Sequence, residues 1–521
     1  MSKKDLIKNG IKSAKHIAIL KPISQIVSFL ATVLLVRLLS ENDYGIYNLF
    51  YSLIGLLGMI ASFGIANTLQ RFMPEYYARK EYIVAHKLYK ISSIIRLISN
   101  IVILGLIFLL WESIAPILKI EAHKKIFILF SIIILLNMQR RLLEVCLNSF
   151  FLQKNTQILS IAFMLIRCAG YLIALLKNLD LWSVFVIDLA AHLIIFICLH
   201  VIYKFRIPID KGELHEIIIE EKRRLTRYSL FHNFNDIGNS ILAVNFDNFI
   251  IVMYLNPVMV GVYSFSQRVS HMIKGLNPVN YFIDVIRPIF FSFDSKRETT
   301  KINQIYNLLI KLSHLFYIPI LFFLINYRDE IINTLFAGKF IEYSLVLVGV
   351  FFFAMLNSFQ QPIGLIAQLK EKADIILYSK VFAVYNIIAD ILLIKYFGVW
   401  GAVFATGTAT FFKTIFIWYF LKNDITHKNL ASFFTKLISF WAFIAMINYL
   451  LKFITQHEYI ILLIGLVVYV ISFLIQFKLN IFNREEKQFI LNKITNPRIR
   501  NIMIFFLNSR NKSGVLNIEM M

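Results

Sequence analysis

Stretches of about 20 apolar residues recur along the whole chain, and no other feature restricts the possible fold as strongly. One of them, YIILLIGLVVYVISFLI at 459–475, contains no charged residue. A helix needs about 20 such residues to cross the hydrocarbon core of a bilayer, where every backbone polar group must be satisfied within the segment. The sequence therefore predicts an all-α, polytopic membrane protein.

The composition supports this prediction. Hydrophobic types make up 58% of the 521 residues and charged types 16%, whereas charged residues account for about 25% of a soluble protein. So few polar side chains cannot cover a water-exposed surface. The net charge of +23 would suggest nucleic acid in a soluble protein. Here the basic residues lie between apolar runs, where they face anionic lipid, so nucleic acid is excluded as a partner.

The apolar runs predict about 14 transmembrane helices, at 20–38, 46–70, 90–111, 125–148, 157–177, 181–203, 229–254, 259–287, 304–326, 343–363, 375–394, 400–421, 432–452 and 459–477. Lys and Arg are concentrated in alternate loops, and such loops face the cytoplasm. We therefore expect both termini in the cytoplasm. The lysine-rich N-terminus is expected to form a basic amphipathic helix on the inner surface.

A charged segment at 204–228 divides the chain. The expected parts are an N-terminal lobe (1–203, the basic start and spans one to six), an inter-lobe loop (204–228) and a C-terminal lobe (229–421, spans seven to twelve). Two further spans (432–477) and a basic cytoplasmic tail (478–521) follow.

The two halves of the chain resemble one another. The GIY triplet at 45–47 matches GVY at 261–263, a separation of 216 positions, and LDLWSVFVI at 179–187 matches FGVWGAVFA at 397–405, a separation of 218. Matches at nearly one separation indicate an internal repeat. Six spans separate equivalent points, so the two lobes share one orientation and are related by a pseudo-two-fold axis along the membrane normal. Transporters that rock two bundles about a central site have this arrangement.

About ten Lys and Arg residues fall inside predicted spans. Each costs about 2.5–3.5 kcal/mol at the bilayer centre, so it must pair, reach the interface or face a watered cavity. Glu144 lies four residues from Arg140 and three from Arg141 and can neutralise one of them. Such pairing leaves a net positive interior, which suits an anionic substrate such as phosphate or pyrophosphate.

The seventh predicted span has the most polar face, with Asn233, Asp236 and Asp247 among its residues. Its oxygens can bind Na⁺ or relay protons; equally, they can form a polar seam between helices. Asp188 and Asp390, in other spans, each balance a nearby cation on the simpler interpretation. No metal-binding or disulfide spacing joins Cys146, Cys168 and Cys198, which are expected to pack in the core.

Enzyme signatures are missing from the sequence. There is no Walker A motif, no GxGxxG opening a helix and no HExxH. We therefore expect a protein that is not an enzyme and has no resident cofactor or metal, with Na⁺ or H⁺ as the coupling ion.

The chain resembles the polysaccharide (O-antigen type) flippases of the multidrug/oligosaccharidyl-lipid/polysaccharide exporter superfamily. The resemblance is carried by the basic N-terminus, RLLSENDYGIYNLFYSLIGLLGMIASFGIANTLQRFMPEY at 37–76, Asp247 followed by NPVMVGVYSF at 256–265, and the GVWGAVFAT segment at 398–406. It extends over essentially the whole chain.

This resemblance implies two six-helix lobes around a cationic cavity, with two extra C-terminal helices. It also implies translocation of a polyprenyl-pyrophosphate-linked oligosaccharide across the cytoplasmic membrane by alternating access, driven by an ion gradient. On this basis the diphosphate-binding residues are expected to be Arg140, Arg141, Arg268, Lys274 and Lys311. Arg37, Arg71 and Arg287 are expected at the gate where the lobes meet, and Asp236, Asp247 and Asn233 at the ion-coupling site.

Membrane lipids, a glycan polymerase and glycosyltransferases are the other expected partners. Two alternatives within the same fold are a multidrug exporter and a peptidoglycan-precursor flippase. A membrane-embedded glycan polymerase or acyltransferase is an alternative of a different class, which the duplicated halves and short outward loops disfavour.

Overall fold

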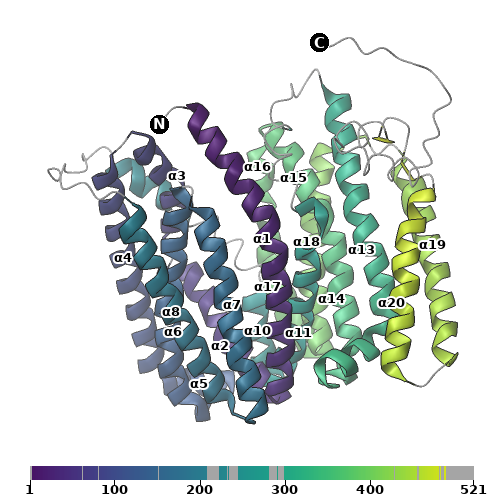
Figure 1. Ribbon diagram of the computed structural model, residues 1–521, viewed down its shortest axis with the longest axis horizontal. Coiled ribbons are helices and arrows are strands. Elements are labelled where there is room, and N and C mark those ends of the chain that lie inside the picture. The colour runs from purple at the N-terminus through teal and green to yellow at the C-terminus, as the bar shows by residue number, and fades with distance from the viewer. Residues whose placement is uncertain are drawn as a thin grey trace. The chain divides into compact units, whose positions relative to one another are not determined.

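The structure is a computed structural model that describes residues 3–61, 63–79, 81–150, 152–207, 222–230, 233, 244–280, 290, 298–426, 429–454, 457–479, 481–482 and 486–487. All regular secondary structure within these residues is helical (Figure 1). The α-helices are α1 (Lys3–Leu38), α2 (Glu41–Ile60), α3 (Ile65–Ala78), α4 (Tyr82–Leu109), α5 (Trp111–Leu118), α6 (Lys124–Ser149), α7 (Gln153–Leu176), α8 (Leu181–Arg206), α10 (Val244–Tyr254), α11 (Pro257–Gly275), α13 (Thr299–Phe336), α14 (Ser344–Leu356), α15 (Gln360–Leu369), α16 (Ala373–Tyr378), α17 (Val381–Phe397), α18 (Val399–Leu421), α19 (Leu430–Leu451) and α20 (Glu458–Ile475).

Ten segments of the described chain are helical, long and apolar enough to cross a membrane. Large apolar side chains cover their outer faces; Leu109, Leu176 and Phe205 are 77%, 76% and 79% exposed. Surfaces of this kind require lipid as the solvent. The expected all-α, multi-pass membrane architecture is confirmed, whereas the described residues give ten candidate spans and not fourteen.

One predicted span differs from the structure. The segment predicted as a single helix at 46–70 forms two helices, α2 and α3, because Phe63 and Gly64 have positive φ values of 44° and 65°. The hydroxyl of Ser229 donates a hydrogen bond to the Phe63 carbonyl oxygen. A Cβ at Gly64 would lie 2.0 Å from the carbonyl oxygen of Ser229. Close backbone packing and a left-handed turn therefore end the helix within an apolar run that has no sequence signal stronger than one glycine.

Three helices begin with N-caps that the sequence supplies. Ser40, Asp180 and Asn256 accept hydrogen bonds from the backbone N–H three residues later, at the starts of α2, α8 and α11. Each cap satisfies a backbone donor that the helix itself leaves open. Pro257 follows Asn256 in α11, a position where its missing N–H costs nothing.

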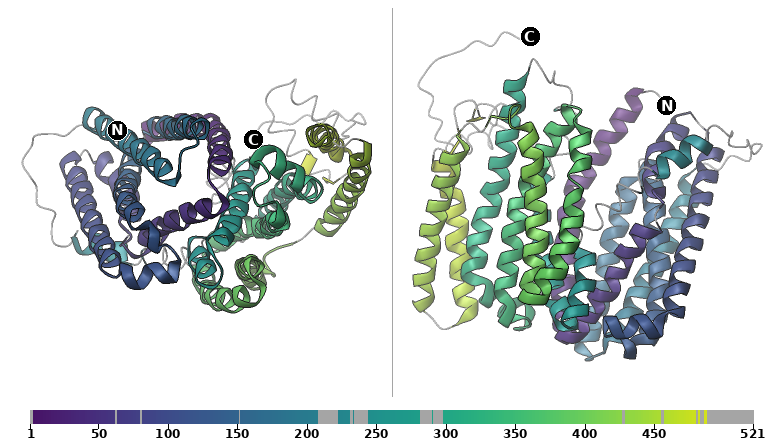
Figure 2. Two further views of the ribbon diagram at one scale, coloured as in Figure 1. Left: turned by 90° about the horizontal axis from the view of Figure 1, so that it is seen from below. Right: turned by 180° about the vertical axis from the view of Figure 1, so that it is seen from behind.

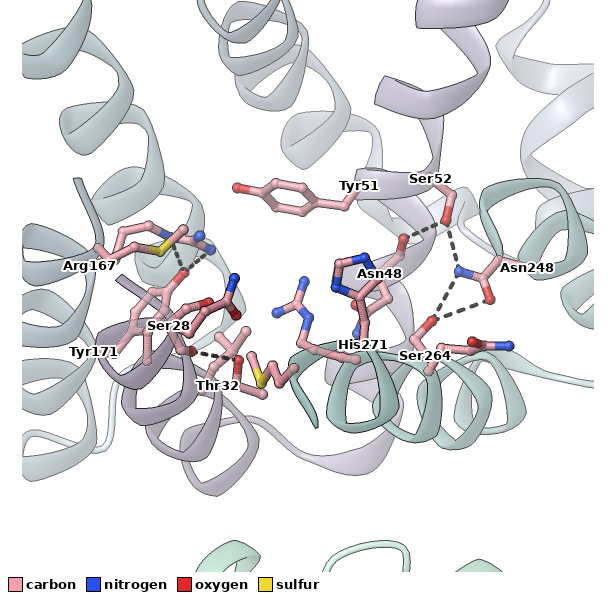
Figure 3. A pocket seen from close by; sticks show the side chains of 17 residues that line it. Ser28, Thr32, Asn48, Tyr51, Ser52, Arg167, Tyr171, Asn248, Ser264 and His271 are labelled. Atoms are coloured by element: carbon pink, nitrogen blue, oxygen red, sulfur yellow. Dashed lines mark hydrogen bonds between the residues drawn. The ribbon is translucent and has the colours of Figure 1, made fainter. Parts of the chain in front are cut away.

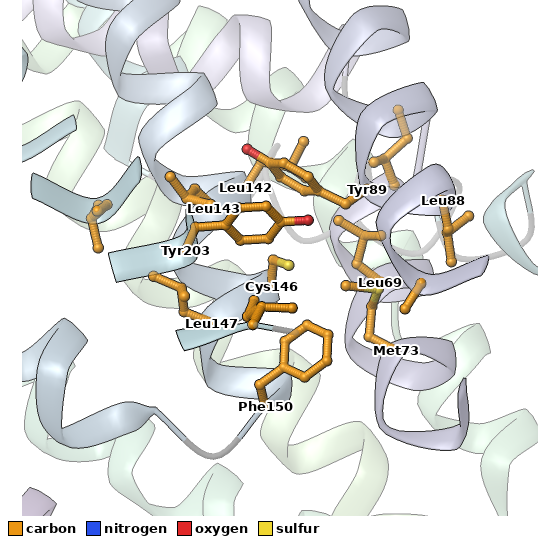
Figure 4. Packing of buried hydrophobic residues seen from close by; sticks show 14 of the residues in the cluster. Leu69, Met73, Leu88, Tyr89, Leu142, Leu143, Cys146, Leu147, Phe150 and Tyr203 are labelled. Atoms are coloured by element: carbon orange, nitrogen blue, oxygen red, sulfur yellow. The ribbon is translucent and has the colours of Figure 1, made fainter. Parts of the chain in front are cut away.

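The chain divides into two compact units. The first comprises Met1–Leu276, Leu335–Val350 and Lys380–Phe412. Within it α1 packs along α7, and α6 packs along α8 (Figures 1 and 2). One core joins α3, α4, α6 and α8 and includes Leu69, Leu142 and Tyr203 (Figure 4). Cys146 is fully buried in this core, which confirms the packing role expected for it.

The second unit comprises Asn277–Thr334, Phe351–Ser379 and Lys413–Met521. Its core gathers apolar residues of α13, α15, α18 and their neighbours, including Ile366 and Leu421. Tyr327 of α13 donates a hydrogen bond of 2.8 Å to Asn448 of α19. Neither unit begins or ends at residues 203 and 228, and the division into lobes at those residues stays a prediction.

Helices α2 and α11 approach one another so closely at Gly45 and Gly261 that a side chain at either position would meet the other helix. A Cβ at Gly45 would lie 1.8 Å from the carbonyl oxygen of Pro257, and a Cβ at Gly261 would lie 3.1 Å from the carbonyl oxygen of Glu41. The contact is reciprocal, because 216 positions separate Gly45 from Gly261 and also Glu41 from Pro257. Equivalent segments of the two repeats, at the start of α2 and the start of α11, therefore contact each other in the structure.

We expect Gly45→Ala to destabilise the protein by about 1–3 kcal/mol, because the new methyl group would overlap backbone atoms that cannot rotate away. The control is Gly105→Ala, since no atom lies within 4 Å of a Cβ at Gly105. There the higher helix propensity of Ala is expected to add up to about 1 kcal/mol. Thermal unfolding of both purified variants in detergent measures the difference, and equal midpoints would contradict the close approach.

Candidate functional site

A cavity of about 450 Å³ lies inside the first unit, between α1, α2, α7, α10 and α11 (Figure 3). Most of its lining side chains are polar. They are Gln25, Ser28 and Thr32 of α1, Asn48, Tyr51 and Ser52 of α2, Arg167 and Tyr171 of α7, Asn248 of α10, and Ser264, Gln267, Arg268 and His271 of α11. No carboxylate is present among these lining residues.

Helix α11 contributes one arginine, Arg268, to the cavity lining. Spacings of three and four residues place Ser264, Arg268 and His271 on one face of the helix. Arg268 is half-buried and has no hydrogen bond or ion pair with any residue in the described part of the chain. Its guanidinium is therefore available to an anionic ligand.

Hydrogen bonds of the Asn248 side-chain amide link three of the helices that form the cavity wall. The Asn248 Nδ2 atom donates to Ser52 Oγ at 2.9 Å and to Ser264 Oγ at 3.0 Å, and Ser52 Oγ donates to the Asn48 carbonyl oxygen at 2.9 Å. These bonds join α2, α10 and α11. They fix hydroxyl and amide groups, which can donate to or accept from a polar ligand, on the cavity wall.

Arg167 and Asp188 form a buried ion pair surrounded by Tyr47, Tyr51 and Tyr171, and we name these five residues the tyrosine cage. The Arg167 Nε atom lies 2.8 Å from Asp188 Oδ1. The hydroxyls of Tyr171, Tyr51 and Tyr47 donate to the same carboxylate at 2.6, 2.5 and 2.9 Å. Both carboxylate oxygens thus have several donors, which a fully buried charge requires.

The tyrosine cage also reaches the cavity, because Arg167, Tyr51 and Tyr171 are lining residues (Figure 3). The hydrogen bonds of Arg167 to described residues use Nε and Nη2. Its Nη1 has no such partner in the described chain. The edge of this guanidinium can therefore contribute positive charge to the cavity wall.

A second buried cluster, the carboxylate cluster, consists of Asp247, Tyr263, Asn386, Asp390 and Thr406. Tyr263 and Thr406 donate to Asp247 Oδ2 at 2.5 and 2.8 Å, and Asn386 Nδ2 donates to Asp390 Oδ2 at 3.0 Å. The carboxyl groups of Asp247 and Asp390 are close enough to interact with each other. No described cationic side chain pairs with either of them.

Three oxygens of the carboxylate cluster, Oδ1 of Asp247, Asn386 and Asp390, are buried and have no hydrogen-bond partner within the described chain. All three side chains are 0% exposed. Leaving such acceptors unsatisfied is costly, and oxygen atoms are the ligands that a hard cation prefers. The donor set fits Na⁺ or a shared proton. In the part of the chain described here, no three or more His, Cys, Asp or Glu side chains come together in a group that could hold a metal ion.

A family model described as "Polysaccharide biosynthesis protein" matches residues 34–345, more than half of the chain. The chain belongs to this family. This membership, together with the relatives described next, confirms the expectation of a polysaccharide flippase of the multidrug/oligosaccharidyl-lipid/polysaccharide exporter superfamily and its transport function at that coarse level.

Individual relatives are more distant. The probable low-salt glycan biosynthesis flippase Agl15 of Haloferax volcanii is 23% identical over 416 residues, covering 77% of this chain and 81% of its own. The solved structure of lipid II flippase MurJ in an inward closed conformation has a TM-score of 0.64 and 16% identity, covering 88% of this chain and 97% of its own. An inward-facing multidrug resistance MATE family transporter has a TM-score of 0.58 and 14% identity, covering 78% and 98%. These two structures show that the flippase has their fold.

Of the five predicted diphosphate-binding residues, Arg268 lines the cavity. Arg140 lies elsewhere in the first unit, where its Nη1 is 3.1 Å from Glu144 and its guanidinium carbon is 4.6 Å from the Phe163 ring centroid. The pairing of Glu144 with one neighbouring arginine is confirmed. Arg141, the next residue of α6, is exposed.

The two predicted lysines lie away from the cavity lining. Lys274 is on α11, six residues beyond Arg268, and is half-buried. Lys311 belongs to the second unit and is 0% exposed, with its Nζ 2.7 and 2.8 Å from the two carboxylate oxygens of Glu486. The predicted role of these residues in binding stays a prediction, and the structure gives Lys311 a counterion.

The predicted gating residues lie at separate places. The Arg37 Nε donates to the Leu335 carbonyl oxygen at 2.8 Å, and Arg71 pairs with Glu75 at 3.1 Å on an exposed surface. Arg287 lies outside the described residues. Of the predicted ion-coupling residues, Asp247 belongs to the carboxylate cluster, Asn233 is half-buried, and Asp236 is also outside the described residues.

Glu75 binds more than one arginine. Its carboxylate lies 2.7 Å from Arg79 and 3.3 Å from Arg224, in addition to Arg71. Burial alone would raise the pKa of Glu75, but the hydrogen bond and charge of Arg224 and the charges of the other arginines lower it below its ordinary value. This ion-pair network attaches residues 222–230 to α3.

Sequence reasoning underestimated the two clusters. Asp188 and Asp390 were interpreted as counterions, and Arg167 as one intramembrane cation among several. The interpretation is correct for Asp188 and wrong for Asp390, whose hydrogen-bond partner within the described residues is the neutral Asn386. The internal repeat is the sequence signal that could have related the two clusters. It aligns Asp188 of the tyrosine cage with Thr406 of the carboxylate cluster.

We expect Glu486→Gln to destabilise the second unit by about 3–5 kcal/mol, because it leaves the Lys311 ammonium buried without a counterion. The double variant Lys311→Met with Glu486→Leu should recover most of this loss, since apolar side chains replace a buried pair well. Thermal unfolding and membrane expression level measure both. A single variant as stable as the wild type would contradict the buried ion pair.

Proposed function

We propose that this flippase translocates a polyprenyl-pyrophosphate-linked oligosaccharide from the inner to the outer leaflet of the cytoplasmic membrane by alternating access, coupled to an ion gradient. The observation that carries the proposal is Arg268, a guanidinium in a polar cavity with no carboxylate among the lining residues. The family membership and the likeness to Agl15, named as a glycan biosynthesis flippase, support the substrate class.

The chemistry of the cavity suits a diphosphate attached to sugars. A guanidinium offers two parallel N–H donors that match phosphate oxygens. The edge of Arg167 adds a second positive group, while Asn248 and the hydroxyls of Ser52 and Ser264 can exchange hydrogen bonds with sugar hydroxyls. A low-dielectric surrounding strengthens each of these electrostatic contacts.

The carboxylate cluster is the proposed ion-coupling site. Asp247 was expected in this role, and Asp390 and Asn386 supply the further oxygens without partners. A bound Na⁺ or proton would supply positive charge there. Asp247 and Asn248 are adjacent on α10, so the carboxylate cluster and the cavity wall share one helix through which the ion gradient can act.

We further propose the architecture of fourteen helices with both termini in the cytoplasm, and two six-helix lobes. The reciprocal contact of repeat-equivalent glycines supports a pseudo-two-fold relation. A glycan polymerase and glycosyltransferases are the proposed partners.

A peptidoglycan-precursor exporter is the second candidate, favoured by the likeness of fold to MurJ. Its substrate would bind the same cations. A multidrug exporter is less consistent with the site, because the described cavity lining carries Arg268 and no acidic side chain for a cationic drug. The polymerase or acyltransferase alternative gains no support from the relatives, which are flippases and transporters.

Arg268→Ala should lower the rate of translocation about 10- to 150-fold, the equivalent of one charge-assisted hydrogen-bonding group worth about 1.5–3 kcal/mol. Arg268→Lys should retain part of the rate because it keeps the charge and loses the bidentate geometry. The assay reconstitutes the protein in proteoliposomes with a lipid-linked oligosaccharide and measures its exposure to an added glycosidase.

Arg206→Ala is the matched control, since Arg206 is an exposed arginine at the C-terminal end of α8. It should translocate at the wild-type rate. A wild-type rate in Arg268→Ala, at equal protein level, would remove the proposed diphosphate site.

Asp247→Asn should abolish the acceleration that an imposed ion gradient gives, because the carboxylate cluster loses a charge needed to hold a cation. Binding of the lipid-linked substrate should persist, since Arg268 is intact. Asp374→Asn, an exposed position in the first turn of α16, is the control. Undiminished gradient dependence in Asp247→Asn would exclude this cluster as the coupling site.

A further inference from the structure

Four of the five residues in the tyrosine cage are repeat-equivalent to four residues of the carboxylate cluster, and the fifth members, Tyr51 and Asp247, do not correspond to one another. Tyr47 and Tyr263 are 216 positions apart, Asp188 and Thr406 are 218 apart, and the two remaining pairs are 219 apart. Those remaining pairs are Arg167 with Asn386 and Tyr171 with Asp390. The repeat was recognised by separations of 216 and 218, and 219 differs from the second of these by one position.

Part of the local geometry is shared by the two clusters. The repeat-equivalent tyrosines of α2 and α11 each donate to an aspartate, with Tyr47 at 2.9 Å from Asp188 and Tyr263 at 2.5 Å from Asp247, although these two aspartates are not themselves repeat-equivalent. The other helix contributes two side chains four residues apart on one face, Arg167 and Tyr171 in one half, Asn386 and Asp390 in the other.

The charges of the two clusters differ in a specific way. The tyrosine cage holds one carboxylate and one guanidinium, and both oxygens of Asp188 are satisfied. The carboxylate cluster holds two carboxylates, and Oδ1 of both is buried without a hydrogen-bond partner among described residues. One half therefore carries its own cation, while the other has oxygens arranged for a cation that no described side chain supplies.

We infer that Arg167 is a resident cation, which permanently occupies in the first half the place where the second half binds an exchangeable coupling cation. This inference rests on the coupling site proposed above. Because the guanidinium is covalently attached, the first half cannot release its cation during a cycle, and each cycle uses one coupling cation and not two.

The test removes the resident cation. In a chain with Asp247→Asn and Asp390→Asn, thermal unfolding in detergent should not respond to Na⁺. Adding Arg167→Gln leaves Asp188 and its three tyrosines without a counterion, with an amide at the position equivalent to Asn386. Replacing choline by saturating Na⁺ should then raise the unfolding midpoint by about 2–4 °C or more.

Matched controls separate this effect from ionic strength and from simple loss of stability. Adding Asp188→Asn to the triple variant should abolish the Na⁺ response, since no carboxylate remains to bind the ion. A folded triple variant whose midpoint is the same in Na⁺ and choline would overturn the inference. A response that survives Asp188→Asn would overturn it as well.

Binding of radioactive ²²Na⁺ keeps the inference testable if the triple variant does not fold. The wild type should bind one Na⁺ per chain, and two would overturn the inference. Absence of Na⁺ binding by the wild type would instead count against Na⁺ at the proposed coupling site. The thermal unfolding of the variants then tests the role of Arg167 independently. The reverse change, Asn386→Arg, should abolish Na⁺ binding, because it places a resident cation in the second half. Unchanged Na⁺ binding in that variant would contradict the inference.

Discussion

The low dielectric of a bilayer requires every buried charge to have a partner, and this requirement explains how the ionisable side chains of this protein are arranged. Lys311 has Glu486, Arg140 has Glu144, and Arg167 has Asp188 with three tyrosine hydroxyls. These three cations are neutralised within the protein. A ligand can act where the protein's own pairing is incomplete, as it is at Arg268 and at the carboxylate cluster.

These two sites have opposite charge, which suits a transporter of an anionic substrate coupled to a cation. The cavity is built on the repeat, because Asn48 and Ser264 are repeat-equivalent lining residues, as are Ser52 and Arg268. The lining positions are thus related by the repeat, whereas the charges of the side chains at those positions are not. A neutral serine in one half and an arginine in the other give the cavity a fixed orientation for a headgroup.

The sequence predicted the helical membrane fold well because long apolar runs depend only on local composition. It failed at 46–70, where the break at Phe63 and Gly64 depends on backbone packing with Ser229, a contact far along the chain. The candidate site was harder to predict from the sequence for the same reason. Arg140, Arg268 and Lys311 are alike as intramembrane cations. The spacing of Glu144 predicts a partner for Arg140, but the pairing of Lys311 with Glu486, 175 residues away, is seen only in three dimensions.

The contact of Gly45 with Pro257 has a mechanical consequence. Two backbones that touch without intervening side chains can act as a fulcrum, since rolling there displaces no packed group. Helix α2 has 20 residues, most of which lie on the C-terminal side of Gly45, and this part forms a lever of roughly 22 Å. Tilting by about 10° at this fulcrum would carry the far end of α2 through about 4 Å, enough to widen or narrow a passage while the pivot itself stays closed.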